Sequence, residues 1–375
     1  MNNIGEKIIF LKNFIINIIN NPRKNRMRKK YNIFTMDDYF KEKDRIDFIE
    51  NKFPLFIEDE NNKQQHINNL EYLRTIGNLV PPLEFVEEKK KEKNELKSII
   101  IDNKDIFDEK YKNEIAYLKK INDLKVFPYD FYDKYFLNMQ SIEVKHKNHL
   151  KYIMHKNEPV FFPKSYSDEM VLTNYIQLIM EQDKNSPHLY FSEKVNFEGG
   201  IFVDVGSAEG IISLDVIKSA SEVFLFERSK EWIKALNNTF KPYKDKVHII
   251  PYYAGGYDSG EVITLDTVLK KYNNENIFIK IDVEGMEIEV LRGCKNTIKN
   301  NNCKFSCACY HTKTMEKRLE DAFCEMGYKT EISDGYMLFI YGDMTLRNGM
   351  YERMEYPYFR KGLVRAYLEK GYLNF

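Results

Sequence analysis

Short, nearly continuous apolar runs recur through the second half of the chain, and most of them lead into an acidic residue or a glycine. The runs cover residues 202–205, 222–226, 247–250 and 277–281, and stretches of helical periodicity separate them. Apolar runs of this length are typical of strands that are buried on both faces of a parallel sheet. Their alternation with helices predicts an α/β fold.

The run at 202–205 turns through a glycine-rich loop into a helix that we expect to open at residue 211. Glycines let a ligand approach the backbone, and the free N–H groups of the helix point into the same space. Asp204 beside this loop would repel a diphosphate but attract a cationic, amine-bearing ligand such as S-adenosylmethionine. The pattern favours a methyl donor over NAD, although a tight turn with close helix packing is the alternative interpretation. The loop residues expected to contact the donor are Asp204, Gly206, Ser207, Glu209 and Gly210.

Residues at the ends of the next runs complete the predicted donor site. Glu227 follows the second run at the spacing expected of an acid that accepts hydrogen bonds from two ribose hydroxyls. Tyr253 and Ala254 follow the third run, where an adenine ring can stack, with ordinary packing as the alternative. The predicted donor contacts beyond the loop are Glu227, Arg228, Tyr253, Ala254 and Asp282.

An ordered set of short motifs between residues 200 and 341 resembles the FkbM-type methyltransferases. The motifs are Asp204 to Gly210, Phe226-Glu227, Thr264-Leu265-Asp266, Ile279 to Glu287, Leu291-Arg292-Gly293 and Tyr310-His311. The resemblance implies a Rossmann-like class I methyltransferase sheet, mostly parallel with an antiparallel last strand, and S-adenosylmethionine as the cofactor. It also implies O-methylation, often of a sugar hydroxyl on a surface glycan or of a secondary metabolite. Many relatives carry Ala then Asn in the first loop, where this chain has Ser207, Ala208 and Glu209.

Titratable residues at the ends of the fourth and fifth predicted strands are the candidates for catalysis. A sugar hydroxyl must lose its proton, and we expect His311 to be the general base, with Asp282 orienting either His311 or the acceptor and Glu284 beside them. In an alternative arrangement, Asp282, Glu284 and His311 bind a divalent ion that lowers the pKa of the hydroxyl. The candidate substrate contacts are His188, Tyr310 and Arg360.

The chain divides into four predicted segments. Residues 1–148 are expected to form a mainly helical accessory domain for docking or oligomerisation, and residues 149–199 a hairpin and helix that act as a lid. Residues 200–342 are the predicted donor-binding core, closed by an antiparallel pair of strands at 327–332 and 335–341. Residues 343–375 are the predicted tail, whose tyrosines and arginines suit a sugar or phosphate, or packing over the core.

Composition narrows the set of partners. The 375 residues carry 57 basic and 57 acidic side chains, which argues against a protein that binds nucleic acid over its whole surface. Five cysteines without a disulfide spacing indicate core packing and a reducing cytoplasm. An amphipathic helix beside a basic cluster at residues 4–30 predicts peripheral contact with the inner membrane, or else packing on its own domain or in a homodimer.

The expected activity is O-methylation of a sugar hydroxyl on a glycan or on its sugar-nucleotide precursor. A non-catalytic module that binds S-adenosylmethionine is the alternative from a different class, and a secondary-metabolite O-methyltransferase is another. Methylation of nucleic-acid bases is disfavoured, because residues 282–285 read Asp-Val-Glu-Gly where such enzymes often carry Asn/Asp-Pro-Pro-Tyr.

Overall fold

A computed structural model describes residues 97–98, 100–101, 109–121, 124–137, 141–312, 314–338 and 359–369. Contacts within the chain define two units, of which the larger comprises residues 109–117, 125–344 and 353–375. The predicted helix at 4–30 and most of the predicted accessory domain lie outside the described residues.

Helices and strands alternate through the larger unit as the apolar runs predict. The strands are β1 (Lys145–Lys147), β2 (Leu150–His155), β3 (Glu158–Phe162), β4 (Gly200–Val205), β5 (Ala220–Phe226), β6 (Val247–Ile250), β7 (Tyr253–Ala254), β8 (Val262–Ile263), β9 (Asn276–Ile281), β10 (Asn302–Ala308), β11 (Lys329–Ile332), β12 (Met337–Leu338), β13 (Phe359–Arg360) and β14 (Leu363–Tyr367). The helices are η4 (Glu109–Tyr111), α7 (Lys112–Leu118), α8 (Phe131–Leu137), α9 (Asp168–Glu181), α10 (Ile211–Val216), α11 (Lys230–Thr239), η6 (Lys241–Tyr243), α12 (Leu265–Val268), α13 (Glu287–Arg292), α14 (Lys295–Asn300) and α15 (Met315–Glu325).

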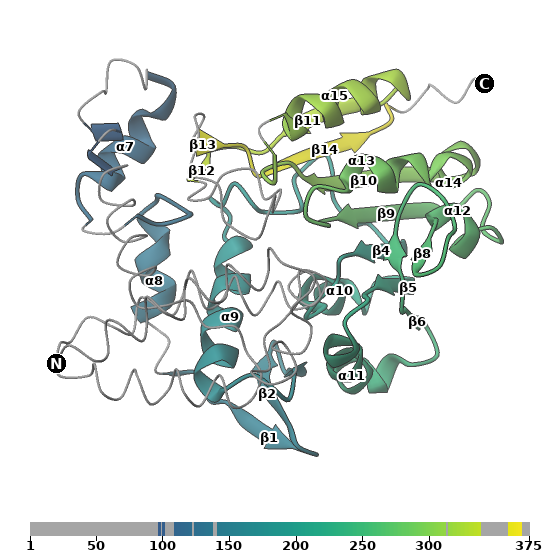
Figure 1. The fold of residues 1–375 in the computed structure, drawn as a ribbon, viewed down its shortest axis with the longest axis horizontal. Helices are drawn as coiled ribbons and strands as arrows, with labels where there is room; N and C mark the ends of the chain where they lie inside the picture. The colour runs from purple at the N-terminus through teal and green to yellow at the C-terminus, as the bar shows by residue number, and fades with distance from the viewer. Residues whose placement is uncertain are drawn as a thin grey trace, which may run out of the picture. The chain divides into compact units, whose positions relative to one another are not determined.

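A seven-stranded sheet runs through the centre of this unit, in the order β11-β14-β10-β9-β4-β5-β6 (Figure 1). The pairs β4–β5, β5–β6, β4–β9 and β9–β10 are parallel, and β14 is antiparallel to both of its neighbours. The chain steps outward from β4 to β5 and β6, then returns to the other side of β4 for β9. The strand order therefore reverses between β4 and β9, and in open α/β sheets ligands bind beyond the carboxyl ends of the strands at such a point.

Alternate residues of the central strands supply two separate apolar cores. Phe202, Val223 and Phe278 join the core on the face covered by α9, α10 and α11. Val203 and Ile279 join the core on the face covered by α12 to α15. Side chains on a strand alternate between faces, so strands that are apolar at almost every position can be covered by helices on both sides.

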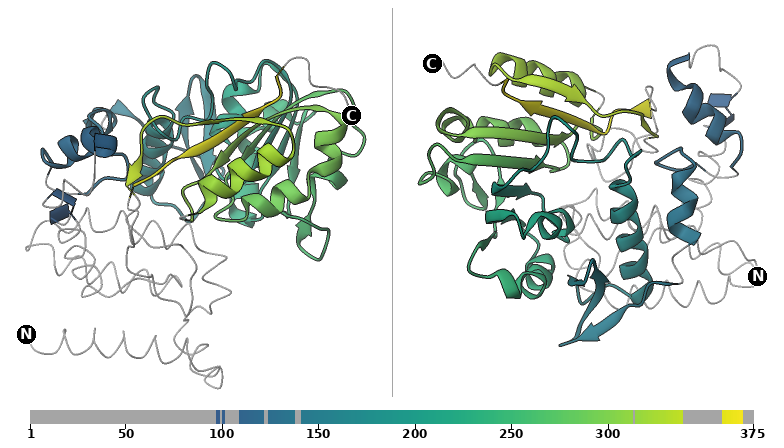
Figure 2. Two further views of the ribbon diagram at one scale, coloured as in Figure 1. Left: turned by 90° about the horizontal axis from the view of Figure 1, so that it is seen from above. Right: turned by 180° about the vertical axis from the view of Figure 1, so that it is seen from behind.

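The hairpin and helix expected before the core are present. Strands β2 and β3 pair antiparallel, and α9 lies beside them, as the view from behind in Figure 2 shows. The Ser167 side chain accepts a hydrogen bond of 3.1 Å from the Met170 N–H and caps α9 as predicted. The loop from 182 to 190 then leads towards β4.

The last strand of the sheet is not the one that we predicted. Residues 329–332 form β11, but its antiparallel partner is β14 in the predicted tail, and β12 pairs with β13 outside the main sheet. Residues 363–367 thus belong to the core sheet, between β10 and β11. Most of β14 is buried, which accounts for its apolar positions within a tail that otherwise looks polar and aromatic.

Four of the five cysteines, namely Cys294, Cys303, Cys307 and Cys309, are buried and free, and Cys324 is exposed. The buried four lie in the apolar core on the α12 to α15 face, as the packing interpretation predicted. Among the residues that the structure describes, no helix combines the length and the apolar content needed to cross a membrane.

The placement of β14 predicts that the tail contributes to stability. Leu363 is fully buried in β14, so Leu363→Ala is expected to lower the free energy of unfolding by ~2–5 kcal/mol. Leu137 is 81% exposed at the end of α8, and Leu137→Ala serves as the matched control with a change within about 0.5 kcal/mol. Urea unfolding of both variants measures the difference, and equal stabilities would contradict the burial of β14.

Candidate active site

We call the glycine-rich loop at residues 206–210 the donor loop. It packs against the end of β9, at the point where the strand order reverses. Gly206 has φ +79°, and a Cβ there would lie 2.0 Å from the Asp282 carbonyl oxygen. The Asp282 N–H donates a 3.0 Å hydrogen bond to the Val205 carbonyl, which joins the two strand ends. Only glycine fits at position 206. This close contact makes the donor loop, which we expect to bind the donor, a neighbour of Asp282, which we expect to lie on the acceptor side.

The other loop residues are largely engaged within the protein. Gly210 has φ +70°, and a Cβ there would lie 2.8 Å from side-chain atoms of Leu236 and of Phe240. Ser207 is buried and donates from its N–H to the Phe226 carbonyl, and Glu209 is buried as well. Both glycines therefore serve packing, the alternative interpretation of the motif, and Gly206 also shapes the surface at the loop.

The carboxylate of Glu227 lies where a ribose-binding acid is expected. It stands at the end of β5, accepts a 3.1 Å hydrogen bond from the Ala208 N–H, and accepts another of 2.6 Å from the Ser229 N–H. The carboxylate is thereby held next to the donor loop. This charged acceptor beside a glycine turn fits the hydroxyl-rich end of an adenosyl group.

Arg228, Tyr253 and Ala254 occupy the strand ends beyond Glu227. Arg228 forms an ion pair with Glu261, and Tyr253 and Ala254 make up the short strand β7. Tyr253 is 48% exposed, so its ring is accessible for stacking. Adenine contact by these residues remains a prediction.

The carboxylate of Asp204 is neutralised within the core. Asp204 is 1% exposed, lies opposite Lys280 in the β4–β9 register, and its Oδ1 is 2.9 Å from the Lys280 Nζ. Its Oδ2 accepts a 2.7 Å hydrogen bond from the Ser213 hydroxyl. Burial lowers the pKa of Lys280, but the charges of Asp204 and Asp282 outweigh it and raise that pKa above its ordinary value. Asp204 therefore supports the loop through Lys280 and Ser213, and its neutralised carboxylate does not attract a cationic ligand directly, as we had predicted.

Asp282 is the centre of the second half of the site. The Tyr190 hydroxyl donates to Asp282 Oδ2 at 2.7 Å, and the Tyr310 hydroxyl donates to Oδ1 at 3.3 Å. The Nε2 atoms of His188 and His311 lie 3.6 Å and 3.4 Å from these two oxygens respectively. Burial raises the pKa of Asp282, but the adjacent imidazoles of His188 and His311 and the charge of Lys280 lower it far below the usual range. Asp282 is therefore an anion held by two phenols and two imidazoles.

His311 bridges carboxylates on both of its edges. Its Nδ1 lies 2.9 Å from Glu287 Oε1, and its Nε2 lies 3.4 Å from both Asp282 Oδ1 and Glu284 Oε2. Burial lowers the pKa of His311, yet the charges of Glu284, Glu287 and Asp282 raise it to about 9. The imidazole is therefore mainly protonated at neutral pH. The predicted trio of His311, Asp282 and Glu284 does come together.

Glu287 is a site residue to which the sequence analysis assigned no role. It is fully buried at the start of α13, and its Oε1 accepts hydrogen bonds of 3.2 Å from the N–H groups of Val283 and Gly285. The same oxygen faces His311 Nδ1. An acid five residues beyond Asp282 was the available signal, but its partner His311 follows a different strand.

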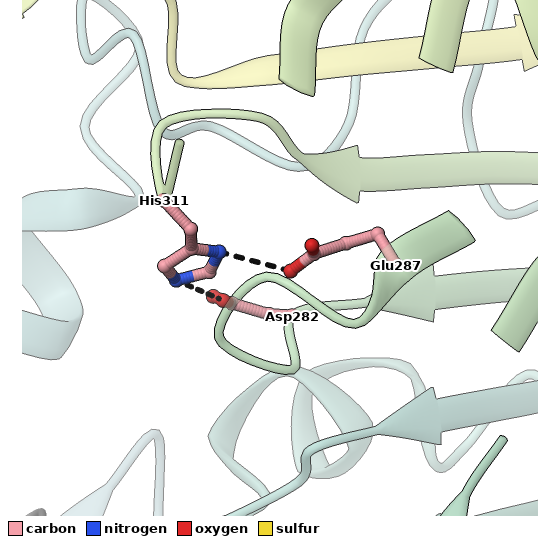
Figure 3. Close-up of side chains that lie close together, drawn as sticks. All are labelled: Asp282, Glu287 and His311. Carbon is pink, nitrogen blue, oxygen red and sulfur yellow. Dashed lines mark hydrogen bonds and ion pairs between the residues drawn. The ribbon is translucent and has the colours of Figure 1, made fainter. Parts of the chain in front are cut away.

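The described part of the chain contains one group of side chains that could bind a metal ion, but two of its members are carboxylates that contact the imidazole of the third. Asp282, Glu287 and His311 offer ligand atoms that all lie within 4.8 Å of one another. Figure 3 shows the His311 ring between the two carboxylates, with one nitrogen facing each. A cation bound by this set would have to displace a proton of the imidazole. The geometry suits an imidazolium bridge better than a shared metal.

The three predicted substrate contacts divide into two groups. His188 and Tyr310 face Asp282, with their ring centroids 5.4 Å apart. Arg360 is buried, and its NH1 donates hydrogen bonds to the carbonyl oxygens of Tyr310 and His311 at 2.8 Å and 3.2 Å. That guanidinium nitrogen thus contacts the protein backbone, which is a different role from the predicted grip on a sugar or phosphate.

Comparison with known proteins identifies the domain. Residues 204–330 match the family model for the methyltransferase FkbM domain, and no curated protein matches the sequence. The chain is similar to the methyltransferase FkbM of Methylobacillus flagellatus KT, with 14% identity and a TM-score of 0.36 over 67% of this chain and 64% of that one. It is also similar to precorrin-6y C5,15-methyltransferase of Geobacter metallireducens GS-15, with 12% identity and a TM-score of 0.32 over 47% and 83%. The alignment spans just under two thirds of the Methylobacillus chain.

The strand order and the glycine loop at its reversal are those of a class I methyltransferase fold, and the matching family model is that of a methyltransferase domain, a class whose methyl donor is S-adenosylmethionine. Within that class, residues 204–330 match the methyltransferase FkbM domain, which confirms the family resemblance of the sequence over those residues.

The close approach at Gly206 predicts a specific defect in donor binding. Gly206→Ala introduces backbone strain of ~1–3 kcal/mol and an overlap with the Asp282 carbonyl, so the Kd for S-adenosylmethionine is expected to rise about tenfold or more. Gly260 has φ +54° with nothing within 4 Å of a Cβ, so Gly260→Ala is the control for strain alone. Calorimetric titration compares the two, and unchanged binding in Gly206→Ala would remove the loop from the donor site.

Proposed function

We propose that the protein transfers a methyl group from S-adenosylmethionine to a sugar hydroxyl of a surface glycan or of its activated precursor. The observation that carries this proposal is the cluster of Asp282 with His188, Tyr190, Tyr310 and His311, which we call the Asp282 centre. Its anionic carboxylate and two imidazoles lie directly beside the donor loop. A module that only binds the donor has no use for this arrangement. A hydroxyl acceptor does use it, because its proton must be removed.

The residues of the site can divide the work of the transfer. When bound, S-adenosylmethionine supplies an electrophilic methyl group on a sulfonium that is already a good leaving group. The acceptor oxygen forms the new bond to the methyl carbon while the carbon–sulfur bond breaks, and the hydroxyl proton passes to His311 Nε2. Asp282, 3.4 Å from Nε2, stabilises the imidazolium that forms, and it can accept a hydrogen bond from a neighbouring hydroxyl of the sugar that holds the acceptor in line. Glu287 fixes the imidazole through Nδ1.

The surroundings of Asp282 support a polyhydroxylated acceptor. The Tyr190 and Tyr310 hydroxyls both donate to Asp282, because burial and the neighbouring negative charge raise the pKa of each phenol and keep it protonated. Tyr190 is buried, but the partly exposed ring of Tyr310 next to the carboxylate provides apolar surface and a hydrogen-bond acceptor for a sugar ring. A secondary-metabolite hydroxyl is the second candidate acceptor.

Glycans of the source organism test the substrate class. Deleting the gene is expected to remove one methyl group from one sugar, and mass spectrometry of surface glycans detects the loss. Wild-type protein should restore the methyl, whereas His311→Ala should not, because loss of a general base reduces turnover by about 10²–10⁴-fold. Gly260→Ala is the matched control and should restore it. Unmethylated glycans in the parent strain would refute a glycan acceptor.

The pKa of His311 predicts the pH dependence of the reaction. His311 must be neutral to accept a proton, and its pKa of about 9 means that the neutral fraction rises about tenfold per pH unit up to that value. Single-turnover rates should therefore climb from pH 7 and level off near pH 9. The profile should be unchanged after thorough chelation, while loss of turnover with chelator would assign activation of the hydroxyl to a divalent ion.

A further inference from the structure

Two loops present the four side chains that surround Asp282. His188 and Tyr190 lie in the loop between α9 and β4, whereas Tyr310 and His311 follow the end of β10. None of these four residues belongs to a helix or strand. Their side-chain positions therefore depend on what holds the backbone of the two loops.

Arg360 in β13 holds the loop after β10. Its side chain is 5% exposed, and NH1 donates to the carbonyl oxygens of both Tyr310 and His311. One guanidinium nitrogen thus bonds two consecutive peptide groups. Because His311 carries the imidazole that faces Glu287 and Asp282, the peptide orientation set by Arg360 also sets the direction of that ring.

Arg365 in β14 holds the loop before β4. Its Nε donates to the Tyr190 carbonyl at 3.2 Å, its NH2 donates to the Leu189 carbonyl at 2.5 Å, and its NH1 pairs with Glu331 at 2.8 Å. Arg365 is also 5% exposed. A rigid planar fork with donors on several nitrogens suits this task, whereas a lysine ammonium would reach fewer of these acceptors.

Gly362 lies between the two arginines and touches both loops. A Cβ at this position would lie 2.1 Å from the Pro187 carbonyl oxygen, and the Gly362 carbonyl accepts a 2.9 Å hydrogen bond from the Cys309 N–H. The segment 360–365 therefore runs in contact with both loops at once.

We propose that Arg360 and Arg365 are positioning residues for the side chains of the Asp282 centre. Arg360 positions one half through Tyr310 and His311. Arg365 positions the other half through Leu189 and Tyr190. This inference rests on the proposed function only for its effect on turnover. The C-terminal segment is then part of the active-site framework, although it lies outside residues 204–330 of the FkbM domain.

Histidine NMR tests the role of Arg360 without any acceptor. Full-length protein labelled at the histidine ring carbons is titrated with pH, and the His311 signal is assigned from its loss in His311→Gln. In Arg360→Met the pKa of His311 should fall from about 9 towards its ordinary value, because the ring turns away from its carboxylates. Arg318 is exposed on α15, and Arg318→Met is the matched control, in which this pKa should not change.

The same spectra test Arg365. Arg365→Met should move the His188 signal, whose ring packs on Tyr190, and leave the pKa of His311 unchanged. A purely structural effect would alter the signals of both histidines in the same way in both variants, and that result would overturn the proposal. An unchanged pKa of His311 in Arg360→Met would overturn it as well. If a Met variant does not fold, Arg360→Lys and Arg365→Lys should show the same selective changes at smaller size. Turnover of the proposed reaction should fall in each, with donor Kd unchanged.

Discussion

The buried pair of Asp204 and Lys280 is the interaction on which both halves of the site depend. The two residues lie opposite each other where β4 and β9 meet, and the Lys280 ammonium also donates to the Gly206 carbonyl at 2.7 Å. It lies 5.4 Å from the centre of the Tyr190 ring, whose hydroxyl bonds Asp282. Removing either partner would leave a buried charge unpaired, which typically costs ~3–5 kcal/mol. Such a substitution would disturb both the donor loop and the residues around Asp282.

Strand β9 carries this coupling because of its periodicity. Lys280 lies in β9 and Asp282 directly follows its end two residues on, and both side chains lie beside Tyr190. One supports the loop at Gly206, and the other receives the hydroxyls of Tyr190 and Tyr310. The strand on one side of the reversal thus orders residues that come from β4, from the loop after α9 and from the loop after β10.

Local patterns in the sequence predicted the parts of the fold that are decided locally. The apolar runs gave the positions of β4, β5, β6 and β9, and the Ser167 cap gave the start of α9. The position of β14 could not be read this way, since its neighbours β10 and β11 are separated from it along the chain and its short apolar run is interrupted by Arg365, a residue type common in the rest of the tail. The role of Asp204 was misjudged for the same reason, because its partner Lys280 lies on another strand. The cluster of Asp282, Glu284 and His311 was predicted, but the arginines that orient its loops were not.

The charges of the site favour a cationic donor, but through the carboxylates around His311 and not through Asp204. Asp204 is offset by Lys280 and cannot repel a diphosphate as we first argued. Asp282, Glu284 and Glu287 all contact His311, and a protonated imidazole offsets one of these three carboxylates. The remaining negative charge lies where the donor loop meets β9. Anionic ligands are disfavoured there and a sulfonium is favoured by the same negative charges that raise the pKa of His311.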